Sequence, residues 1–495
     1  MVEITDKGLF LRKIPLPGFG KSIPFDEIEN IDLLNGNGFV LHRTGHRPLS
    51  VKGLSSRIAQ KIVSGINEIL DPEIAKKEKP LFPDETDQII KNLCSRNGIR
   101  PGIILDFIVN QAILQRATDI HFEYIGAAYR ARFRIDGVLK NIAVIPDSIR
   151  SRLIACIKNS AGLASYRHDV PQEGRLTHEI KDIKAIGKNG KIGNSEKHNV
   201  ELRLSVIPAI GGESIVLRLF SALKGSFGLD DLGFSSSFRK SYDETLESRQ
   251  GLILLSGPGN SGKTTTIYAS LRYLMSGPRS GQRAVCLEDP VEFPIECASQ
   301  IEIDPQRGNT FDNLLSKVLR QDVEVIMLGE IRDSATAKIA LRAALTGHLI
   351  LATVHCGRAA EVPRRLIDLG TKASETAEAI ASMTAQRLIR RICPHCKIQR
   401  PITDQERNFL SIPETIVSVH EGKGCEFCMN TGYFGQIAIG EHIKMTPEII
   451  EMVRENASVS SISKSAGLMG DIRNDALYKV SKGISTLEEI KGFLR

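Results

Sequence analysis

The chain has 495 residues, 41% of them hydrophobic and 25% charged, with a formal net charge of +7. These proportions are ordinary for a globular protein of about three domains, and no apolar run reaches the roughly 20 residues of a membrane span. A charge of +7 over this length does not by itself indicate a nucleic-acid partner. The first residues, MVEITDKGLFLRK, include acids and lack an apolar core, so we expect no signal peptide and a cytoplasmic location.

Residues 1–75 are predicted to form a small α+β docking module that resembles a PH-like domain. Short alternating runs, such as residues 39–42, predict several strands, and the apolar periodicity of residues 58–70 predicts one amphipathic helix. The module shows no catalytic constellation. Residues 76–88 are rich in charge and proline, which predicts a linker.

Residues 89–225 are predicted to form a second α+β domain. A helical pattern covers residues 103–117, and strand-like arms follow at residues 129–135 and 200–205. The lysine- and glycine-rich residues 181–198 predict an exposed hairpin tip. A solvated surface is the simpler interpretation of this tip, and contact with nucleic acid or lipid is the alternative.

Arginines are frequent on the strand-like segments of this domain. Those considered are Arg130, Arg132, Arg134, Arg203 and Arg218. Alternation along a strand accounts for about half of them as solvent-facing side chains. The others could face a nucleotide held by another domain or subunit, because a guanidinium is permanently charged and binds phosphate oxygens in a bidentate manner.

A linker at residues 226–240 precedes an alternation of strands and helices over residues 241–390. The predicted strands lie at residues 252–255, 284–288, 323–328 and 349–354. Aliphatic runs separated by helices are typical of a parallel sheet covered on both faces.

The first of these strands leads into GPGNSGKT at residues 257–264, which satisfies the pattern G-x-x-x-x-G-K-[ST]. Glycines let backbone N–H groups surround a phosphate, Lys263 reaches the β- and γ-phosphates, and the Thr264 hydroxyl ligates Mg²⁺. A strand before the motif and a helix after it complete the expected context, so we predict that the chain binds a nucleoside triphosphate. The residues predicted to bind it are Gly257, Pro258, Gly259, Asn260, Ser261, Gly262, Lys263, Thr264 and Thr265.

Acids and histidines stand at the ends of the later strands. Glu330 ends the run VIMLGE, where an acid beside a P-loop holds Mg²⁺ or polarises the attacking water. Residues 288–292 (EDPVE) form a second acidic cluster, whose simpler interpretation is an exposed turn. His348 and His355 bracket another apolar run, where a histidine is either structural or sensitive to the γ-phosphate.

Two C-x-x-C pairs, at residues 393–396 and 425–428, are separated by residues 397–424, a segment of 28 residues. Four thiolates match a structural Zn²⁺ site, and redox activity is the alternative. The predicted zinc ligands are Cys393, Cys396, Cys425 and Cys428. We assign residues 391–440 to this subdomain and residues 441–495 to a helical C-terminal cap.

Several segments resemble motifs of the secretion ATPases, the hexameric motors of type II secretion and type IV pilus assembly. LEDPVE, LRQDVEVIMLGEIRD and TGHLILATVH resemble the Asp box, Walker B and His box of that family. The resemblance extends through ATDIHFE, RFRIDGVL, PQEGR and RLSVIPAIGGESIVLRLF upstream, and through AQRLIRRICPHC and GISTLEEI downstream. It covers residues from about 90 to 495.

The resemblance implies a RecA-like core preceded by a PAS-like α+β domain, with ATP, Mg²⁺ and structural Zn²⁺ as bound groups. It implies that Glu330 is the catalytic Walker B glutamate and that Glu288 is the Asp-box acid near Mg²⁺ and the attacking water. It also implies that His348 and His355 contact the phosphate region. The zinc module is similar to that of assembly motors rather than retraction motors.

The resemblance further implies a cytoplasmic homo-hexamer that associates peripherally with an inner-membrane platform protein, in which Arg203 and Arg218 reach a nucleotide across domains. Departures from the family pattern concern fine tuning. Asp322-Val323-Glu324 replaces the usual D-P-D, Cys356 stands where a hydroxyl is common, and Glu173 replaces an aspartate.

Two other classes of function compete with a secretion motor. A nucleic-acid motor, such as a helicase or a conjugative DNA-transfer ATPase, shares the core, but aromatics make up only 5% and tryptophan is absent, which disfavours base stacking. A non-hydrolysing scaffold disagrees with the presence of Lys263, Thr264 and Glu330.

Overall fold

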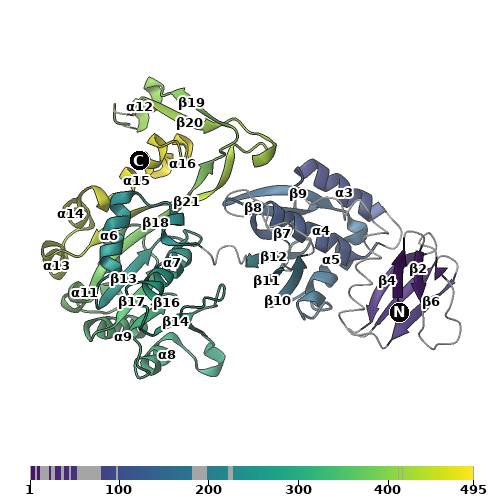
Figure 1. Ribbon diagram of the computed structural model, residues 1–495, viewed down its shortest axis with the longest axis horizontal. Helices are drawn as coiled ribbons and strands as arrows, with labels where there is room; N and C mark the ends of the chain where they lie inside the picture. The colour runs from purple at the N-terminus through teal and green to yellow at the C-terminus, as the bar shows by residue number, and fades with distance from the viewer. Residues whose placement is uncertain are drawn as a thin grey trace. The chain divides into compact units, whose positions relative to one another are not determined.

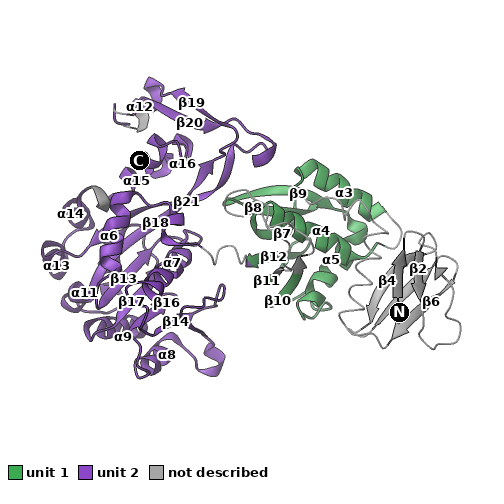
Figure 2. Cartoon of the chain, viewed as in Figure 1, with its two compact units in different colours: residues 1–219 green, residues 220–495 purple. Residues whose placement is uncertain are grey.

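The computed structural model describes residues 80–95, 99–180, 198–220, 227–410, 412–414 and 416–493, together with the backbone of six short strands before residue 53. The chain divides into two compact units, residues 1–219 and 220–495 (Figure 2). The predicted helix at residues 58–70 lies outside the described residues, as does the predicted insertion at residues 181–198 apart from His198.

The strands near the N-terminus form two small antiparallel sheets, ordered β1-β2-β3 and β4-β5-β6. Their bounds are β1 (Val2–Thr5), β2 (Gly8–Leu11), β3 (Ser22–Ile23), β4 (Ile28–Leu34), β5 (Gly38–Arg43) and β6 (His46–Lys52). Short strands were expected in this segment from its alternating pattern.

The described remainder of the first unit contains a six-stranded sheet, in the order β10-β11-β12-β7-β8-β9, and three helices. In chain order its elements are α3 (Pro83–Ser95), α4 (Pro101–Leu114), β7 (Ala117–Ile125), β8 (Ala128–Ile135), β9 (Val138–Ile145), α5 (Asp147–Ser160), β10 (Gln172–Ile180), β11 (His198–Ala209) and β12 (Gly212–Phe220). The strand-like arms predicted at residues 129–135 and 200–205 fall within β8 and β11.

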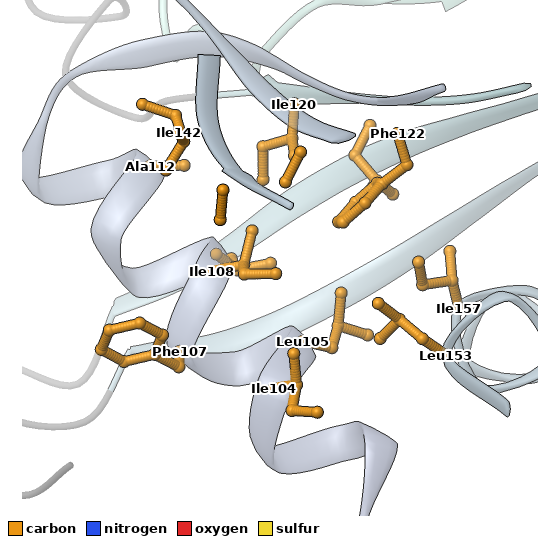
Figure 3. Close-up of a cluster of buried hydrophobic side chains, with 14 of the residues drawn as sticks. Ile104, Leu105, Phe107, Ile108, Ala112, Ile120, Phe122, Ile142, Leu153 and Ile157 are labelled. Carbon is orange, nitrogen blue, oxygen red and sulfur yellow. The ribbon is translucent and has the colours of Figure 1, made fainter. Parts of the chain in front are cut away.

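Helices α4 and α5 supply aliphatic side chains that meet those of the sheet in one core (Figure 3). Along β8 the buried residues Tyr129, Ala131 and Phe133 alternate with arginines that lie on the other face of the sheet. Arg203 on β11 and Arg218 on β12 likewise alternate with buried leucines. The core therefore takes one face of this sheet, and the arginines take the other.

Helix α3 begins at Pro83, inside the segment predicted as a linker. Proline at the first helical position has the required backbone angle, and Asp84 and Glu85 in the first turn suit the positive end of the helix dipole. Ile89 and Ile90 then pack into the core. The proline and the acidic residues that indicated a linker are thus also typical of the first turn of a helix.

A buried charged group holds the loop after α5. The Lys158 ammonium is fully buried and donates to Glu213 Oε1 at 2.7 Å and to the Arg167 carbonyl at 2.5 Å. The other Glu213 oxygen lies 2.7 Å from His168 Nδ1. Because Lys158 depends on Glu213 for its counter-charge, removing either partner leaves a buried charge unpaired.

Glu213→Ala should lower the free energy of unfolding by about 3–5 kcal/mol, because it leaves the Lys158 ammonium buried without a carboxylate. Urea unfolding followed by circular dichroism measures this change. Glu201→Ala is the matched control, since Glu201 is half exposed and its oxygen lies 3.7 Å from Arg175, so its loss should cost less than about 1 kcal/mol. Equal destabilisation by the two substitutions would contradict the argument.

The second unit is organised around a seven-stranded sheet in the order β15-β14-β16-β17-β13-β18-β21. Its strands are β13 (Gly251–Ser256), β14 (Ala284–Glu288), β15 (Ser299–Glu302), β16 (Val325–Leu328), β17 (Leu349–Val354), β18 (Ile380–Ile392) and β21 (Tyr433–Lys444). Neighbouring strands are parallel except for the β18–β21 pair. The α/β fold and the parallel sheet predicted from the sequence are confirmed.

Helices cover both faces of this sheet (Figure 1). One face packs against η3 (Leu229–Leu232), α6 (Ser236–Leu246) and α7 (Lys263–Ser276). The other packs against α8 (Phe311–Val318), α9 (Ser334–Leu345), α10 (Val362–Asp368), α11 (Ala373–Ala379), α13 (Pro447–Arg454) and α14 (Val459–Ser465). The elements η3 and α6 occupy much of the segment predicted as a linker at residues 226–240, and their buried leucines and Phe238 explain why it is ordered.

The strands β18 and β21 extend beyond the sheet and carry the cysteine-containing segment between them. That segment contains β19 (Lys397–Pro401), α12 (Asp404–Leu410), β20 (Ser418–Gly422) and η6 (Glu426–Cys428). The boundaries predicted at residues 390 and 440 fall within β18 and β21, which pair from Ser382 to Ile392. Pairing between distant segments leaves no local pattern from which these boundaries could be predicted. The remaining short elements are η4 (Pro305–Arg307), η5 (Ala359–Glu361), η7 (Gly467–Gly470), α15 (Ile472–Ser481), α16 (Leu487–Ile490) and η8 (Lys491–Phe493).

Among the helices that the structure describes, none combines the length and apolar character needed to cross a bilayer.

Candidate functional site

The predicted phosphate-binding loop at residues 257–264, called the P-loop below, connects β13 to α7 at the carboxyl edge of the parallel sheet. All six residues of β13 are buried, so the strand gives the loop a fixed base. Gly257 and Gly262 adopt positive φ angles of 145° and 86°. A Cβ at Gly257 would lie 2.5 Å from the Gln386 carbonyl oxygen, and one at Gly262 would lie 2.7 Å from Gln386 Nε2. These two glycines are therefore required both by backbone conformation and by space.

Lys263, the first residue of α7, turns its ammonium back into the loop. Its Nζ donates to the Gly257 carbonyl at 2.8 Å and to the Pro258 carbonyl at 2.9 Å. Burial lowers the pKa of Lys263, while the nearby charge of Glu330 acts in the opposite direction. A phosphate at the N-terminus of α7 would meet both this ammonium and the positive end of the helix.

Gln386 on β18 braces the loop from the neighbouring strand. Its Nε2 donates to the Ser261 carbonyl at 2.9 Å, and its Oε1 accepts a 2.8 Å hydrogen bond from the Thr266 hydroxyl. Gln386 belongs to the segment AQRLIRRICPHC, but no role was predicted for it. An amide within a strand otherwise rich in apolar residues is the signal that could have identified it.

Glu330 follows β16 and lies at the same edge of the sheet. Its Oε1 is 2.9 Å from His355 Nε2, and its Oε2 accepts a 2.6 Å hydrogen bond from Arg332 Nε. Arg332 also donates to Asp289 Oδ2 at 3.3 Å. The carboxylate is thus held between two side chains, with His355 following the end of β17.

The acidic cluster at residues 288–292 divides into two environments. Glu288 is buried at the end of β14, where its carboxylate accepts hydrogen bonds from the Tyr268 hydroxyl and from Gln300 Nε2, the latter at 2.9 Å. Burial raises the pKa of Glu288, although these hydrogen bonds act in the opposite direction. Glu292 is exposed, and its Oε1 accepts a 3.3 Å hydrogen bond from the Thr264 hydroxyl.

Thr264 and Glu288 were the two residues predicted to lie near Mg²⁺, and their contacts differ. The hydroxyl of Thr264 and the carboxylate of Glu292 are oxygen donors of the kind Mg²⁺ prefers, so this position fits the ion. Glu288 is occupied by neutral hydrogen-bond donors. Glu288 was predicted to lie near Mg²⁺ and Glu292 was not, because the two acids belong to the same short run and the sequence pattern alone does not distinguish their positions.

His348 lies at the other edge of the sheet from the P-loop. It precedes β17, whose six residues separate it from the carboxyl edge by about 20 Å at 3.3 Å per residue. Its Nδ1 is 3.1 Å from the Ala343 carbonyl, which ties it to the end of α9. The expectation that His348 contacts the phosphate region is therefore not met within one chain. His348 and the P-loop lie at opposite ends of strands that run in the same direction.

Arg203 and Arg218, the other predicted site residues, belong to the first unit. Arg203 donates to Glu173 Oε2 at 2.9 Å, and Arg218 Nε donates to Asp119 Oδ1 at 2.9 Å. Burial alone would raise the pKa of Asp119, but hydrogen bonds from Thr118 and Arg218 outweigh it, and the pKa is lowered. Both arginines are partly exposed and ion-paired, and their approach to a nucleotide stays a prediction.

The four predicted cysteines form one cluster. Their Sγ atoms all lie within 4.8 Å of one another. The Cys393–Cys425 and Cys396–Cys428 pairs are 3.8 Å apart, and the Cys425–Cys428 pair is 3.7 Å apart. A tetrahedral ion with Zn–S bonds near 2.3 Å sets its sulfurs about 3.8 Å apart, so the donor set and its spacing fit zinc. The distances exclude disulfides, whose sulfurs lie about 2.05 Å apart.

A family model described as "Type II/IV secretion system protein" matches residues 99–492. The chain belongs to this family. The match includes the P-loop, the acidic motifs and the cysteine cluster, and it excludes the N-terminal strands.

Individual relatives agree with this assignment. The "Type IV pilus assembly ATPase PilB" of Acinetobacter baylyi is 36% identical over 388 residues, which cover 77% of this chain and 64% of that protein. The "Type II secretion system protein E" of Pseudomonas aeruginosa is 34% identical over 389 residues, covering 78% of this chain and 74% of that protein. The chain thus spans less than two thirds of the Acinetobacter relative's length.

Among solved structures, the ATPase DotB of Legionella pneumophila aligns with a TM-score of 0.56 at 18% identity. The alignment covers 80% of this chain and 96% of DotB. This likeness confirms the RecA-like fold that the family resemblance implied.

The purified chain should contain about one zinc ion per molecule, because four sulfur atoms already stand at tetrahedral spacing. Inductively coupled plasma mass spectrometry measures the ion directly. Cys428→Ser should lower the zinc content strongly, whereas Cys297→Ser, outside the cluster, should leave it unchanged. Absence of zinc from the unaltered chain, with nucleotide binding intact, would contradict the assignment.

Proposed function

We propose that the chain is an ATP-hydrolysing motor that drives assembly of a type II secretion pseudopilus or a type IV pilus. The observation that carries this proposal is the gathering of Lys263, Thr264 and Glu330 at one edge of the sheet. Family membership and the names of the relatives support the same activity.

The residues of this edge divide the work of hydrolysis. Lys263 and the N-terminus of α7 bind the phosphates, and Glu330, oriented by His355 and Arg332, positions the attacking water. Thr264, with an acid of the 288–292 cluster, would hold Mg²⁺, which supplies neutralisation of the phosphate charge. Glu288 retains its proposed role near the water as a buried carboxylate whose pKa is raised.

We further propose that the active form is a homo-hexamer in which Arg203 and Arg218 complete the nucleotide site across domains. Their guanidinium groups lie on the sheet face opposite the core, where Arg203 pairs with the exposed Glu173 and Arg218 pairs with the buried Asp119. Both guanidinium groups are partly exposed, so a phosphate could bind them from the solvent side. The two units would close around ATP and open again after hydrolysis, and this movement would convert the reaction into motion. We also propose that the N-terminal module at residues 1–75 is the docking segment.

The motion is proposed to act on a platform protein of the inner membrane from the cytoplasmic side, so that the chain associates with the membrane peripherally. The names of the relatives, a pilus assembly ATPase and a secretion system protein, support this setting.

Glu330→Gln should lower ATP hydrolysis by at least about 100-fold while leaving ATP binding nearly unchanged, because the amide keeps the shape but not the charge that orients water. Phosphate release and nucleotide binding measure the two properties. Glu296→Gln, at an exposed position away from Glu330, is the control and should behave like the unaltered chain. Undiminished hydrolysis by Glu330→Gln would contradict the catalytic assignment.

Hydrolysis should increase several-fold on addition of the cytoplasmic domain of an inner-membrane platform protein from a type II secretion or type IV pilus machine, and it should not respond to single- or double-stranded DNA. A motor is fastest when its working partner stabilises the closed state. The measurement is the steady-state rate of phosphate release. Stimulation by DNA without stimulation by the platform domain would favour a nucleic-acid motor instead.

A further inference from the structure

Arg387 follows Gln386 on β18 and extends its guanidinium across the carboxyl end of β13. Its Nη2 donates to the Gly357 carbonyl at 2.7 Å, and its Nη1 donates to the Gln386 carbonyl at 2.9 Å. A Cβ at Gly257, the first P-loop glycine, would lie 3.2 Å from the same Nη1. The guanidinium therefore packs against the start of the P-loop and also reaches the segment that follows β17.

Both hydrogen bonds of this guanidinium end on main-chain carbonyls. Within the described part of the chain, no carboxylate oxygen lies within ion-pair distance of it. The acids that act on it electrostatically are Glu441 and Glu361. Glu361 accepts hydrogen bonds from the N–H groups of Gly357 and Arg358, and Glu441 accepts from that of Ala359.

Such an arrangement leaves a positive charge without a direct counter-ion in a half-buried position. Burial lowers the pKa of Arg387, and its positive charge also lowers the pKa of Lys263 beside it. Two cations that repel each other next to an N-terminal helix end are stabilised together when an anion enters between them. The missing counter-charge is thus one that a phosphate can supply.

The position of Arg387 indicates which phosphate. Gly357 lies two residues after His355, whose Nε2 is 2.9 Å from the Glu330 carboxylate. The guanidinium thus joins the loop to the side of the site where Glu330 would position water for attack on the terminal phosphate. The β-phosphate, in contrast, lies over the N-terminus of α7 in a P-loop.

We propose that Arg387 binds the γ-phosphate of the nucleotide held by its own chain. This inference rests on the proposed function. The guanidinium exchanges the Gly357 carbonyl for phosphate oxygens when ATP is present and returns to it in the ADP state. Its bond to the segment after β17 then forms or breaks with the γ-phosphate.

A comparison of nucleotide affinities in the full-length chain tests this role. The probes are ADP and the non-hydrolysable ATP analogue AMP-PNP, each with Mg²⁺, measured by isothermal titration calorimetry. Arg387→Ala should weaken AMP-PNP binding about 10- to 100-fold, the range expected for loss of a charge-assisted hydrogen bond, and should change ADP binding by less than about threefold. Arg387→Lys keeps the charge but loses the bidentate geometry, so its affinity for AMP-PNP should lie between that of the unaltered chain and that of Arg387→Ala.

Arg391→Ala is the matched control, because Arg391 is exposed on the same strand. It should leave both affinities unchanged, and the thermal unfolding midpoint of each variant reports on folding. If Arg387→Ala and Arg387→Lys weaken the binding of ADP and of AMP-PNP equally, Arg387 only stabilises the P-loop and the segment after β17, and the inference is wrong. Unchanged affinities for both nucleotides would overturn it too. An unaltered chain that binds neither nucleotide would instead contradict the proposed function on which the inference depends.

Discussion

The arrangement of the second unit depends on the burial of β13 between β17 and β18. All six residues of β13 are buried, and its hydrogen-bonding groups are satisfied by the two parallel neighbours. Parallel strands bring their carboxyl ends to one edge, so the P-loop, the end of β17 and the continuation of β18 must meet there. Each partner of the loop is a consequence of this pairing, including Gln386, which comes from a strand more than 120 positions later in the chain.

Burial also separates residues that are alike in sequence. Glu288 and Glu292 belong to the same acidic run, yet one is enclosed by Tyr268 and Gln300 while the other is exposed beside Thr264. The desolvation that raises the pKa of Glu288 favours its neutral form. Two carboxylates from one motif are thereby suited to different tasks.

The pairing of β18 with β21 connects the nucleotide site to the cysteine cluster. Gln386 and Arg387 stand near the P-loop, and Cys393 follows the last residue of the same strand. Beyond the sheet, Arg390 bonds both oxygens of Glu489 on α16 and lies over the Tyr433 ring, with 3.9 Å between its central carbon and the ring centroid. The two knuckles are therefore mounted on strands that also belong to the core sheet, rather than on a flexible tether.

Local patterns in the sequence sufficed for the strands at residues 284–288 and 349–354, for a glycine-rich loop between a strand and a helix, and for the cluster of four cysteines. Each of these depends on short-range periodicity or on a motif whose chemistry requires fixed spacing. Strand order, and with it the edge to which a side chain belongs, depends on pairing between distant segments. Only the tertiary structure therefore placed His348 at the edge away from the loop, joined β18 to β21, turned Glu292 rather than Glu288 toward Thr264, and brought Gln386 and Arg387 against Gly257.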